Sequence, residues 1–215
     1  MLNILSQIPI LNKLISSLGV RLLKLLNKNR GYYKINGINM FLDFLDPIDR
    51  EIIITKKYEI KEISTLTKLI DDNKSNYFID VGANCGFYTC QMAQLGLKVD
   101  AFDLNQVAMG KLKKTLEKNP HISEKVTLHN YGLSDTERLC SVDAQVKHGY
   151  VQTGGTSVVD KQILPPNFTR FSAKLRVGDN LLHYRNEHLA LKIDVEGHEP
   201  EVMRGLEKLL TILPQ

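Results

Sequence analysis

The sequence predicts one α/β domain with a mostly parallel sheet and helices on both faces. The first observation is an alternation of short β-rich runs and helical stretches after residue 76. Strands and helices that alternate at this spacing favour parallel strands joined by crossover helices. The strands are expected at residues 77–81, 98–102, 126–129 and 189–195. The helices are expected at residues 86–95 and 105–119, with a further one over residues 200–210.

Length and composition are the second observation. The chain has 215 residues, 43% hydrophobic and 24% charged, which is ordinary for one soluble globular domain with a core. Its three cysteines, Cys85, Cys90 and Cys140, form no CxxC pair. We therefore expect reduced thiols and a cytoplasmic protein, without a disulfide framework or a zinc knuckle. The net charge of +4 is mild, and we expect no nucleic-acid partner.

The segments around the parallel unit have weaker patterns. Residues 32–45 predict a β-hairpin whose tight turn falls at Asn36-Gly37, a strong two-residue turn signal. Residues 59–72 predict a helix. Residues 140–170 lack periodicity and contain several glycines and prolines, so they predict a long, partly ordered loop.

Residues 1–30 form a separate region with leucines at helical spacing and basic residues on the opposite face. The first 42 residues contain six basic residues and no acid. Two interpretations remain open: a basic amphipathic helix on an anionic membrane, at the inner membrane surface, or a helix that packs its leucines on the domain. No stretch is long and uncharged enough to span a bilayer, and no secretory signal is recognisable.

The stretch YFIDVGANCGFYT, residues 77–89, follows a strand with an acid and a glycine turn. Ligands of open α/β sheets bind at the carboxyl ends of the strands. Gly82 and Gly86 would let the backbone come close to a ligand, and a helix that starts near Gly86 would offer free N–H groups to an anion. The turn is therefore predicted to bind a cofactor.

The details of this turn favour a nucleoside with an amino-acid tail. The dinucleotide fingerprint GxGxxG is incomplete, since the turn reads GANCG. S-adenosylmethionine has a carboxylate for the helix end and an ammonium for an acid such as Asp80. Asp103, which lies 23 residues after Asp80 in DAFDLN, could accept both ribose hydroxyls. NAD enzymes place an acid at the same position, so Asp103 alone does not decide between the two cofactors.

A second polar group follows the fourth strand in LKIDVEGHEPEV, residues 191–202. Its members are Lys192, Asp194, Glu196, His198 and Glu199. Because side chains alternate along a strand, the first three should share one face and emerge next to the Gly82 turn. A structural alternative is an ion pair of the lysine with one of the acids, which would hold the loop.

These motifs resemble the FkbM family of S-adenosylmethionine-dependent methyltransferases. The resemblance spans residues 32 to about 210. Its pieces are Tyr58-Glu59, FIDVGANCGFYT, AFDLN, LHNYGLSD at 128–135 and KIDVEGHEPEVMRG at 192–205. It implies a Rossmann-like class I methyltransferase fold, S-adenosylmethionine as cofactor, and methylation of a hydroxyl oxygen. The acceptor that it implies is a small molecule or glycan: a sugar of a glycan or glycolipid, or a secondary metabolite.

The resemblance also assigns residues by position. The implied cofactor-binding residues are Asp80, Gly82, Ala83, Asn84, Gly86, Tyr88, Asp103, Leu104, Asn130, Leu133, Ser134 and Asp194. Among them, Asp103 would hold the ribose, and Asn130, Leu133 and Ser134 would lie near the adenine. Asp194 and Glu196 would lie beside the transferred methyl group.

A sugar hydroxyl is a weak nucleophile, so a positioned base should assist its attack. The candidate bases are Asp194, Glu199 and His198, and we favour one of the two acids because family members often carry other residues in place of the histidine. Lys192 is expected to position Asp194. The predicted catalytic group is thus Lys192, Asp194, Glu196, His198 and Glu199.

Three rival functions remain. The clustered hard ligands Asp194, Glu196, His198 and Glu199 could support metal-assisted methyl transfer. A nicotinamide-dependent oxidoreductase would need a pyrophosphate cradle that GANCG does not supply. The third rival is a non-catalytic S-adenosylmethionine-binding module, or an inactive fragment of a methyltransferase.

The end of the chain carries one further expectation. By the resemblance, the strand order is 3-2-1-4 with more strands beyond the fourth, yet the sequence stops at Gln215. The strand LALKIDV, residues 189–195, should then lie at an open edge of the sheet. We therefore expect the sequence to be a C-terminally truncated version of a longer protein.

Overall fold

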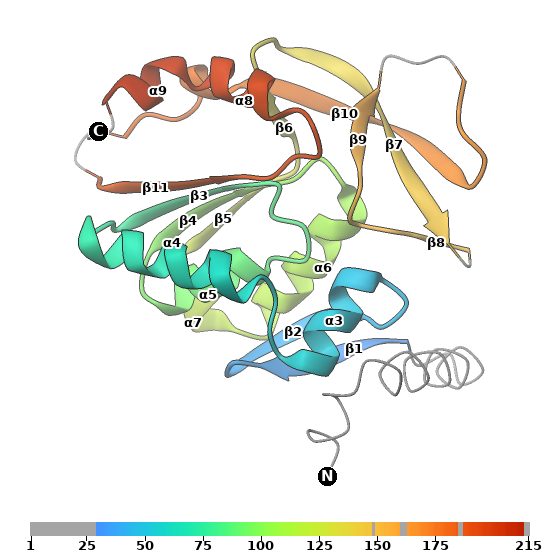
Figure 1. Cartoon of the computed structure of the whole chain (residues 1–215), viewed down its shortest axis with the longest axis horizontal. Coiled ribbons are helices and arrows are strands. Elements are labelled where there is room, and N and C mark those ends of the chain that lie inside the picture. Colours follow the sequence, from blue (N-terminus) through green and yellow to red (C-terminus); the bar gives the residue numbers. More distant parts are fainter. Residues whose placement is uncertain (1–28, 148, 160–162, 185–186, 213–215) are drawn as a thin grey trace.

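The computed structural model describes residues 29–147, 149–159, 163–184 and 187–212. The predicted amphipathic helix of residues 1–30 lies almost wholly outside the described residues. The described chain forms a four-stranded parallel sheet, a second sheet of five strands and an N-terminal hairpin (Figure 1). Within these residues, no helix has both the length and the apolar character needed to cross a membrane.

A four-stranded parallel sheet forms the centre of the fold, in the order β11-β3-β4-β5 (Figure 1). Its strands are β3 (Tyr77–Val81), β4 (Lys98–Phe102), β5 (Val126–His129) and β11 (Leu189–Ile193). The predicted α/β class is confirmed, and the fourth parallel strand lies beside the first, as expected. The last strand ends at Ile193, earlier than the predicted residue 195.

Helices cover both faces of this sheet (Figure 1). On one face lie α4 (Ile60–Asp72), α5 (Phe87–Gln94), α6 (Gln106–Glu117) and α7 (Pro120–Ser123). On the other face lie α8 (Glu199–Gly205) and α9 (Glu207–Ile212). The helices predicted between residues 59 and 119 are confirmed, and the one predicted over residues 200–210 is divided in two.

Alternate residues of the strands supply the two halves of the core, as the pleat of a strand requires. The side chains on the α5 face are Phe78, Val99 and Ala101, and those on the α8 face are Ile79, Val81 and Phe102. All are fully buried or nearly so, and each large one contributes about 1.5–3 kcal/mol of burial free energy. By the same alternation, Asp80 and its register partner Lys192 face the α5 side.

Side-chain caps explain where two helices begin. The Asn105 side chain accepts the N–H groups of Val107 and Ala108 at the start of α6. The Asp46 side chain does the same for α3 (Pro47–Thr55), a helix that the sequence analysis did not predict. Proline at the first position of α3 fits a helix start, because its missing N–H has no partner there in any helix.

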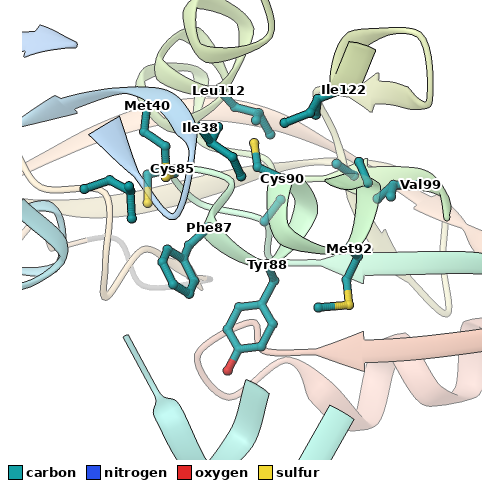
Figure 2. Close-up of a cluster of buried hydrophobic side chains, with 14 of the residues drawn as sticks. Ile38, Met40, Cys85, Phe87, Tyr88, Cys90, Met92, Val99, Leu112 and Ile122 are labelled. Carbon is teal, nitrogen blue, oxygen red and sulfur yellow. The ribbon is translucent and has the colours of Figure 1, made fainter. Parts of the chain in front are cut away.

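The N-terminal hairpin consists of β1 (Arg30–Ile35) and β2 (Ile38–Asp43). Asn36 and Gly37 both have positive φ, at 49° and 90°, as a two-residue hairpin turn demands, so the predicted turn is confirmed. Figure 2 shows Ile38 and Met40 of β2 in the same cluster as Leu112 of α6. The hairpin is therefore part of the main core.

A second sheet replaces the long loop predicted over residues 140–170, and that prediction is wrong. Its strands are β6 (Gly132–Ser134), β7 (Arg138–Lys147), β8 (Tyr150–Val151), β9 (Ser157–Val159) and β10 (Phe168–Val177). The long strand β7 turns Cys140, Val142 and Ala144 inward. These small inward residues give a weak alternation signal, and the glycines and prolines of the connections hid it.

The outer edge of β11 carries no strand within the described residues, where β11 pairs with β3 alone. The expectation of an open edge at residues 189–195 is confirmed for this part of the chain. A groove runs along the edge between β11 and α4, and its lining includes Leu66 and Leu69 of α4 and Leu191 of β11.

Candidate functional site

The glycines of the turn after β3 are required by the packing of the chain on itself. Gly82 has φ +87°, and a Cβ there would lie 1.9 Å from the carbonyl oxygen of Asp194. Gly86 has φ +82°, and a Cβ there would lie 2.2 Å from a methyl carbon of Leu112. Both glycines were predicted to let a ligand come close. Within the fold, they also allow the close approach of the β11 loop and of α6.

A pocket lies at the carboxyl ends of β3, β4 and β11, with about 940 Å³ of empty space that includes its opening to solvent. Predicted site residues line much of it: Gly82, Ala83, Asn84, Tyr88, Asp103, Leu104, Leu133, Lys192, Asp194, Glu196 and His198. Four predicted cofactor residues, Asp80, Gly86, Asn130 and Ser134, and the predicted catalytic Glu199 are not among the lining residues.

Asp103 is held at the end of β4 by two backbone hydrogen bonds. Its Oδ2 accepts the N–H of Asn84 at 2.8 Å, and its Oδ1 accepts the N–H of Asn105 at 2.7 Å. Each carboxylate oxygen keeps acceptor capacity for a second donor. Burial raises the pKa of Asp103 to about 6, in spite of the two backbone hydrogen bonds that lower it. The carboxylate is thus ionised at neutral pH and titrates close to it.

Lys192 lies between two carboxylates on the α5 side of the sheet. Its Nζ is 3.7 Å from Asp80 Oδ1 and 3.4 Å from Asp194 Oδ2, and it lies 5.0 Å from the ring centre of Tyr88. Burial lowers the pKa of Lys192, but the charges of Asp80 and Asp194 more than offset this, so the pKa stands above its ordinary value. The lysine is therefore a cation and not a base at neutral pH.

Asp80 does not line the pocket, but Lys192, whose Nζ lies 3.7 Å from Asp80 Oδ1, does. Asp80 is fully buried, and its Oδ2 accepts the hydroxyl of Thr89 on α5 at 2.6 Å. Its Oδ1 has no hydrogen-bond partner within the described residues. A buried carboxylate in this state depends on the nearby ammonium for compensation.

Asp194 is the most exposed member of this group, with 57% of its side chain accessible. Its backbone N–H donates to the carbonyl of Val81 at 2.9 Å, which fixes the residue against the end of β3. Nearby, the Tyr88 hydroxyl donates to Glu59 Oε2 at 2.7 Å. Asp194 is therefore a carboxylate that a solvent-borne molecule can reach beside a fixed cation.

Glu196 was predicted to share a strand face with Lys192 and Asp194, but it lies beyond the end of the strand, although all three residues line the same pocket. β11 ends at Ile193, and Glu196 and Gly197 take left-handed conformations with φ of 55° and 93°. The strand alternation stops before Glu196 for this reason. Its carboxylate instead accepts the N–H of Gly155 at 3.1 Å, from a segment 41 residues earlier in the chain.

His198 and Glu199 both have partners within the fold. His198 Nε2 lies 3.0 Å from the hydroxyl of Ser134, and its Nδ1 lies 3.6 Å from Glu201. The Glu199 carboxylate accepts the backbone N–H groups of Val195 and Gly197, each at 3.0 Å. Hydrogen bonds from backbone N–H groups, its own included, lower the pKa of Glu199, so it is a weak base.

The polar groups of the β11 loop thus point to different partners. No group of three or more histidine, cysteine, aspartate or glutamate side chains among the described residues is arranged to hold a metal ion. The thiols of the turn are also inert, because burial raises the pKa of Cys90 to about 12 and that of Cys85 well above its ordinary value.

An apolar slot adjoins Asp103. It is lined by Leu104, Leu133, Val158 and Leu175, of which the last three come from the second sheet. Leu133 was predicted near the adenine. Its predicted companions lie elsewhere: Asn130 donates to the carbonyl of Asp103 at 2.9 Å, and Ser134 bonds to His198.

Several lining residues were not among the predicted site residues. They are Ile48, Tyr58, Val81, Cys85, Phe87, Phe102, Gly132, Val158, Leu175, Val195 and the segment Thr153, Gly154, Gly155 and Thr156. The segment 153–156 connects β8 and β9 and reaches the pocket from the second sheet. Its glycine pair between threonines was the available signal, but it was interpreted only as part of a loop.

No family model matches the sequence, and no curated protein matches it. Among solved structures, the chain is similar to the crystal structure of methyltransferase FkbM from Methylobacillus flagellatus KT, with 14% sequence identity and a TM-score of 0.44. The match covers 64% of this chain but only 30% of that chain. Membership of the FkbM family therefore stays a prediction.

Proposed function

We propose that this protein binds S-adenosylmethionine on a Rossmann-like class I methyltransferase fold and transfers its methyl group to a hydroxyl oxygen of a sugar. One observation carries the proposal. A carboxylate suited to a ribose, an apolar slot and a carboxylate held beside a lysine line one pocket at the carboxyl ends of three parallel strands.

The nucleoside part of the cofactor fits the Asp103 side of the pocket. Each oxygen of Asp103 is held by one backbone N–H and can accept one further proton, which matches the two hydroxyls of a ribose. The adjoining slot of Leu104, Leu133, Val158 and Leu175 is apolar and suits a flat base. These residues would hold the nucleoside without any pyrophosphate contact.

The amino-acid part fits the turn itself. Asn84 has φ +51°, and its side-chain oxygen is buried without a hydrogen-bond partner within the described residues. A buried acceptor without a partner is costly, so it supports a ligand donor such as an ammonium at this point. The start of α5, after Gly86, supplies the free N–H groups that a carboxylate requires.

The reaction then needs few protein groups. A bound sulfonium supplies an activated methyl group and a neutral leaving group, so no general acid is required. The acceptor oxygen has to lie in line with the methyl carbon, and this positioning provides much of the rate. An acceptor hydroxyl at Asp194 can donate a hydrogen bond to the carboxylate and transfer its proton there as the oxygen attacks.

We assign the role of general base to Asp194. Among the three candidates it is the accessible one, and its one fixed side-chain partner among the described residues is Lys192. Lys192, kept protonated between Asp80 and Asp194, orients the Asp194 carboxylate. Glu199 holds the backbone of its own loop, and His198 bonds to Ser134, so we assign both to structure.

Isothermal titration calorimetry with S-adenosylhomocysteine and with NAD tests the cofactor. The proposal predicts saturable binding of the first and none of the second. The reverse result would favour the oxidoreductase instead. Mass spectrometry of cell-envelope glycans made with and without the protein then tests for O-methylation, and a methylated non-carbohydrate product would contradict the sugar assignment.

A further inference from the structure

A cluster of buried charges lies beside the pocket and has no part in the chemistry proposed above. Lys111 of α6 is only 6% exposed, and its Nζ lies 2.5 Å from Asp49 Oδ2 and 3.7 Å from Asp46 Oδ2. Both acids belong to the start of α3, and they are 0% and 3% exposed. Burying charges costs desolvation free energy and seldom makes a protein more stable than an apolar core would. These charges are therefore expected to have a role other than stability.

The fourth member of the cluster is Thr153. Its backbone N–H and its hydroxyl both donate to Asp46 Oδ2 at 2.9 Å, and the Lys111 ammonium donates to its hydroxyl oxygen at 3.2 Å. The Thr153 hydroxyl is therefore both donor and acceptor, in a residue that is 4% exposed.

Thr153 is also the first residue of the segment 153–156, which lines the pocket. Two further bonds hold this segment: the Asn105 amide donates to the Thr156 hydroxyl at 3.0 Å, and Gly155 N–H donates to Glu196. Gly154 lies so close to Ile48 that a Cβ there would be 2.7 Å from its terminal methyl. The segment is thus clamped at its start by buried charges and bonded at its end to the residue after Leu104.

We propose that Lys111, Asp46 and Asp49 are positioning residues for the ligand pocket, which act through Thr153 to hold residues 153–156 in place as one of its walls. The identity of the ligand rests on the proposed function, but the clamp itself does not. A variant that loosens this segment would lose one wall of the pocket but keep Asp103 and Asp194. Its affinity for the ligand should fall, while its kcat at saturating ligand stays unchanged.

Assay conditions matter because the clamp depends on charge. Burial raises the pKa of Asp49 to about 6, in spite of the opposing charge of Lys111 and with a smaller contribution from Asp46. At pH 8 the carboxylate is ionised, so the ion pair is intact. All comparisons below are therefore made at pH 8.

A matched pair of variants tests the clamp. Thr153→Val keeps the shape of the side chain but removes the hydroxyl, whereas Thr153→Ser keeps the hydroxyl. We expect T153V to weaken S-adenosylhomocysteine binding about 5–30-fold by calorimetry, and T153S to bind within about twofold of the parent protein. With an acceptor in hand, the KM for S-adenosylmethionine should rise in T153V while kcat is unchanged. Thr153→Ala takes the place of T153V if the valine variant does not fold.

Hydrogen exchange of the peptide that covers residues 153–156 is the second measurement, and it needs no ligand. Faster exchange in T153V than in T153S is expected. Parent-like affinity and exchange in T153V, or equal losses in T153V and T153S, would overturn the proposal. If the parent protein fails to bind S-adenosylhomocysteine, the proposed function fails. The exchange comparison then decides the clamp by itself.

Discussion

The two loops that meet at the pocket are held in place by different kinds of contact. The turn after β3 is fixed by backbone: Gly82 and Ala83 N–H groups donate to the carbonyl of Phe102 at 2.9 and 3.0 Å, and Gly82 leaves no room for a side chain. The loop after β11 is joined to β3 by the Asp194 N–H bond to Val81, and beyond that point it is held by side chains, with Glu196 bonded to Gly155 and Glu199 to the backbone of the loop itself. The turn after β3 is thus a frame set mainly by the backbone, whereas the end of the β11 loop depends on its own side chains.

The largest effect is expected from a substitution in the turn after β3. Gly82→Ala would place a methyl group 1.9 Å from the Asp194 carbonyl at a φ that disfavours any side chain, and we expect a loss of more than about 4 kcal/mol in unfolding free energy. Gly96→Ala is the matched control, because Gly96 has φ +107° but open space around it. It should cost only about 1–2 kcal/mol in denaturant titration. Equal losses in the two variants would contradict the close approach as the cause.

The second prediction concerns the loop after β11. Asp194→Asn keeps the shape of the side chain and removes its charge and basicity. We expect kcat to fall about 10²–10⁴-fold with little change in S-adenosylhomocysteine affinity, measured by methyl-transfer assay and calorimetry. His198→Ala should keep most of the rate. If the histidine variant loses the rate and the asparagine variant keeps it, the assignment of the base is wrong.

The third prediction concerns the pH dependence of ligand binding at Asp103. The pKa of Asp103 is raised by burial to about 6, so the free protein takes up a proton there as the pH falls through that value. Only the ionised carboxylate can accept hydrogen bonds from both ribose hydroxyls. The affinity for S-adenosylhomocysteine should therefore be highest well above pH 6 and decline below it. Asp103→Asn should remove this titration and bind about 5–100-fold more weakly at pH 8. Asp72→Asn, at the exposed end of α4, is the control and should retain the pH profile of the parent protein.

The smallest effect is expected at Glu199. Its pKa is lowered by backbone hydrogen bonds, so its contribution to stability is present above the ordinary glutamate pKa and is lost as the pH falls through the lowered value. Glu199→Gln should therefore be slightly less stable than the parent protein at pH 7, by about 1 kcal/mol, with the difference vanishing in acid. Thermal unfolding at several pH values measures this. A loss of kcat as large as that of D194N would show that Glu199 is the base after all.

The same contrast explains which features the sequence could predict. β3, β4 and β5 begin and end where expected, because hydrophobic runs and glycine turns specify them locally. The direction of Glu196 could not be predicted, since it follows from left-handed residues beyond the end of β11 and from a partner 41 residues away. The wall at 153–156 was missed for a similar reason: the Thr153 clamp joins segments distant in sequence, and no local pattern reports such a contact.

A crystal structure with S-adenosylhomocysteine bound is the most direct test of the proposed cofactor site. We expect both ribose hydroxyls on the Asp103 carboxylate, the adenine in the slot of Leu104 and Leu133, and the sulfur directed toward Asp194. A ligand bound outside this pocket, or one with its ribose away from Asp103, would contradict it.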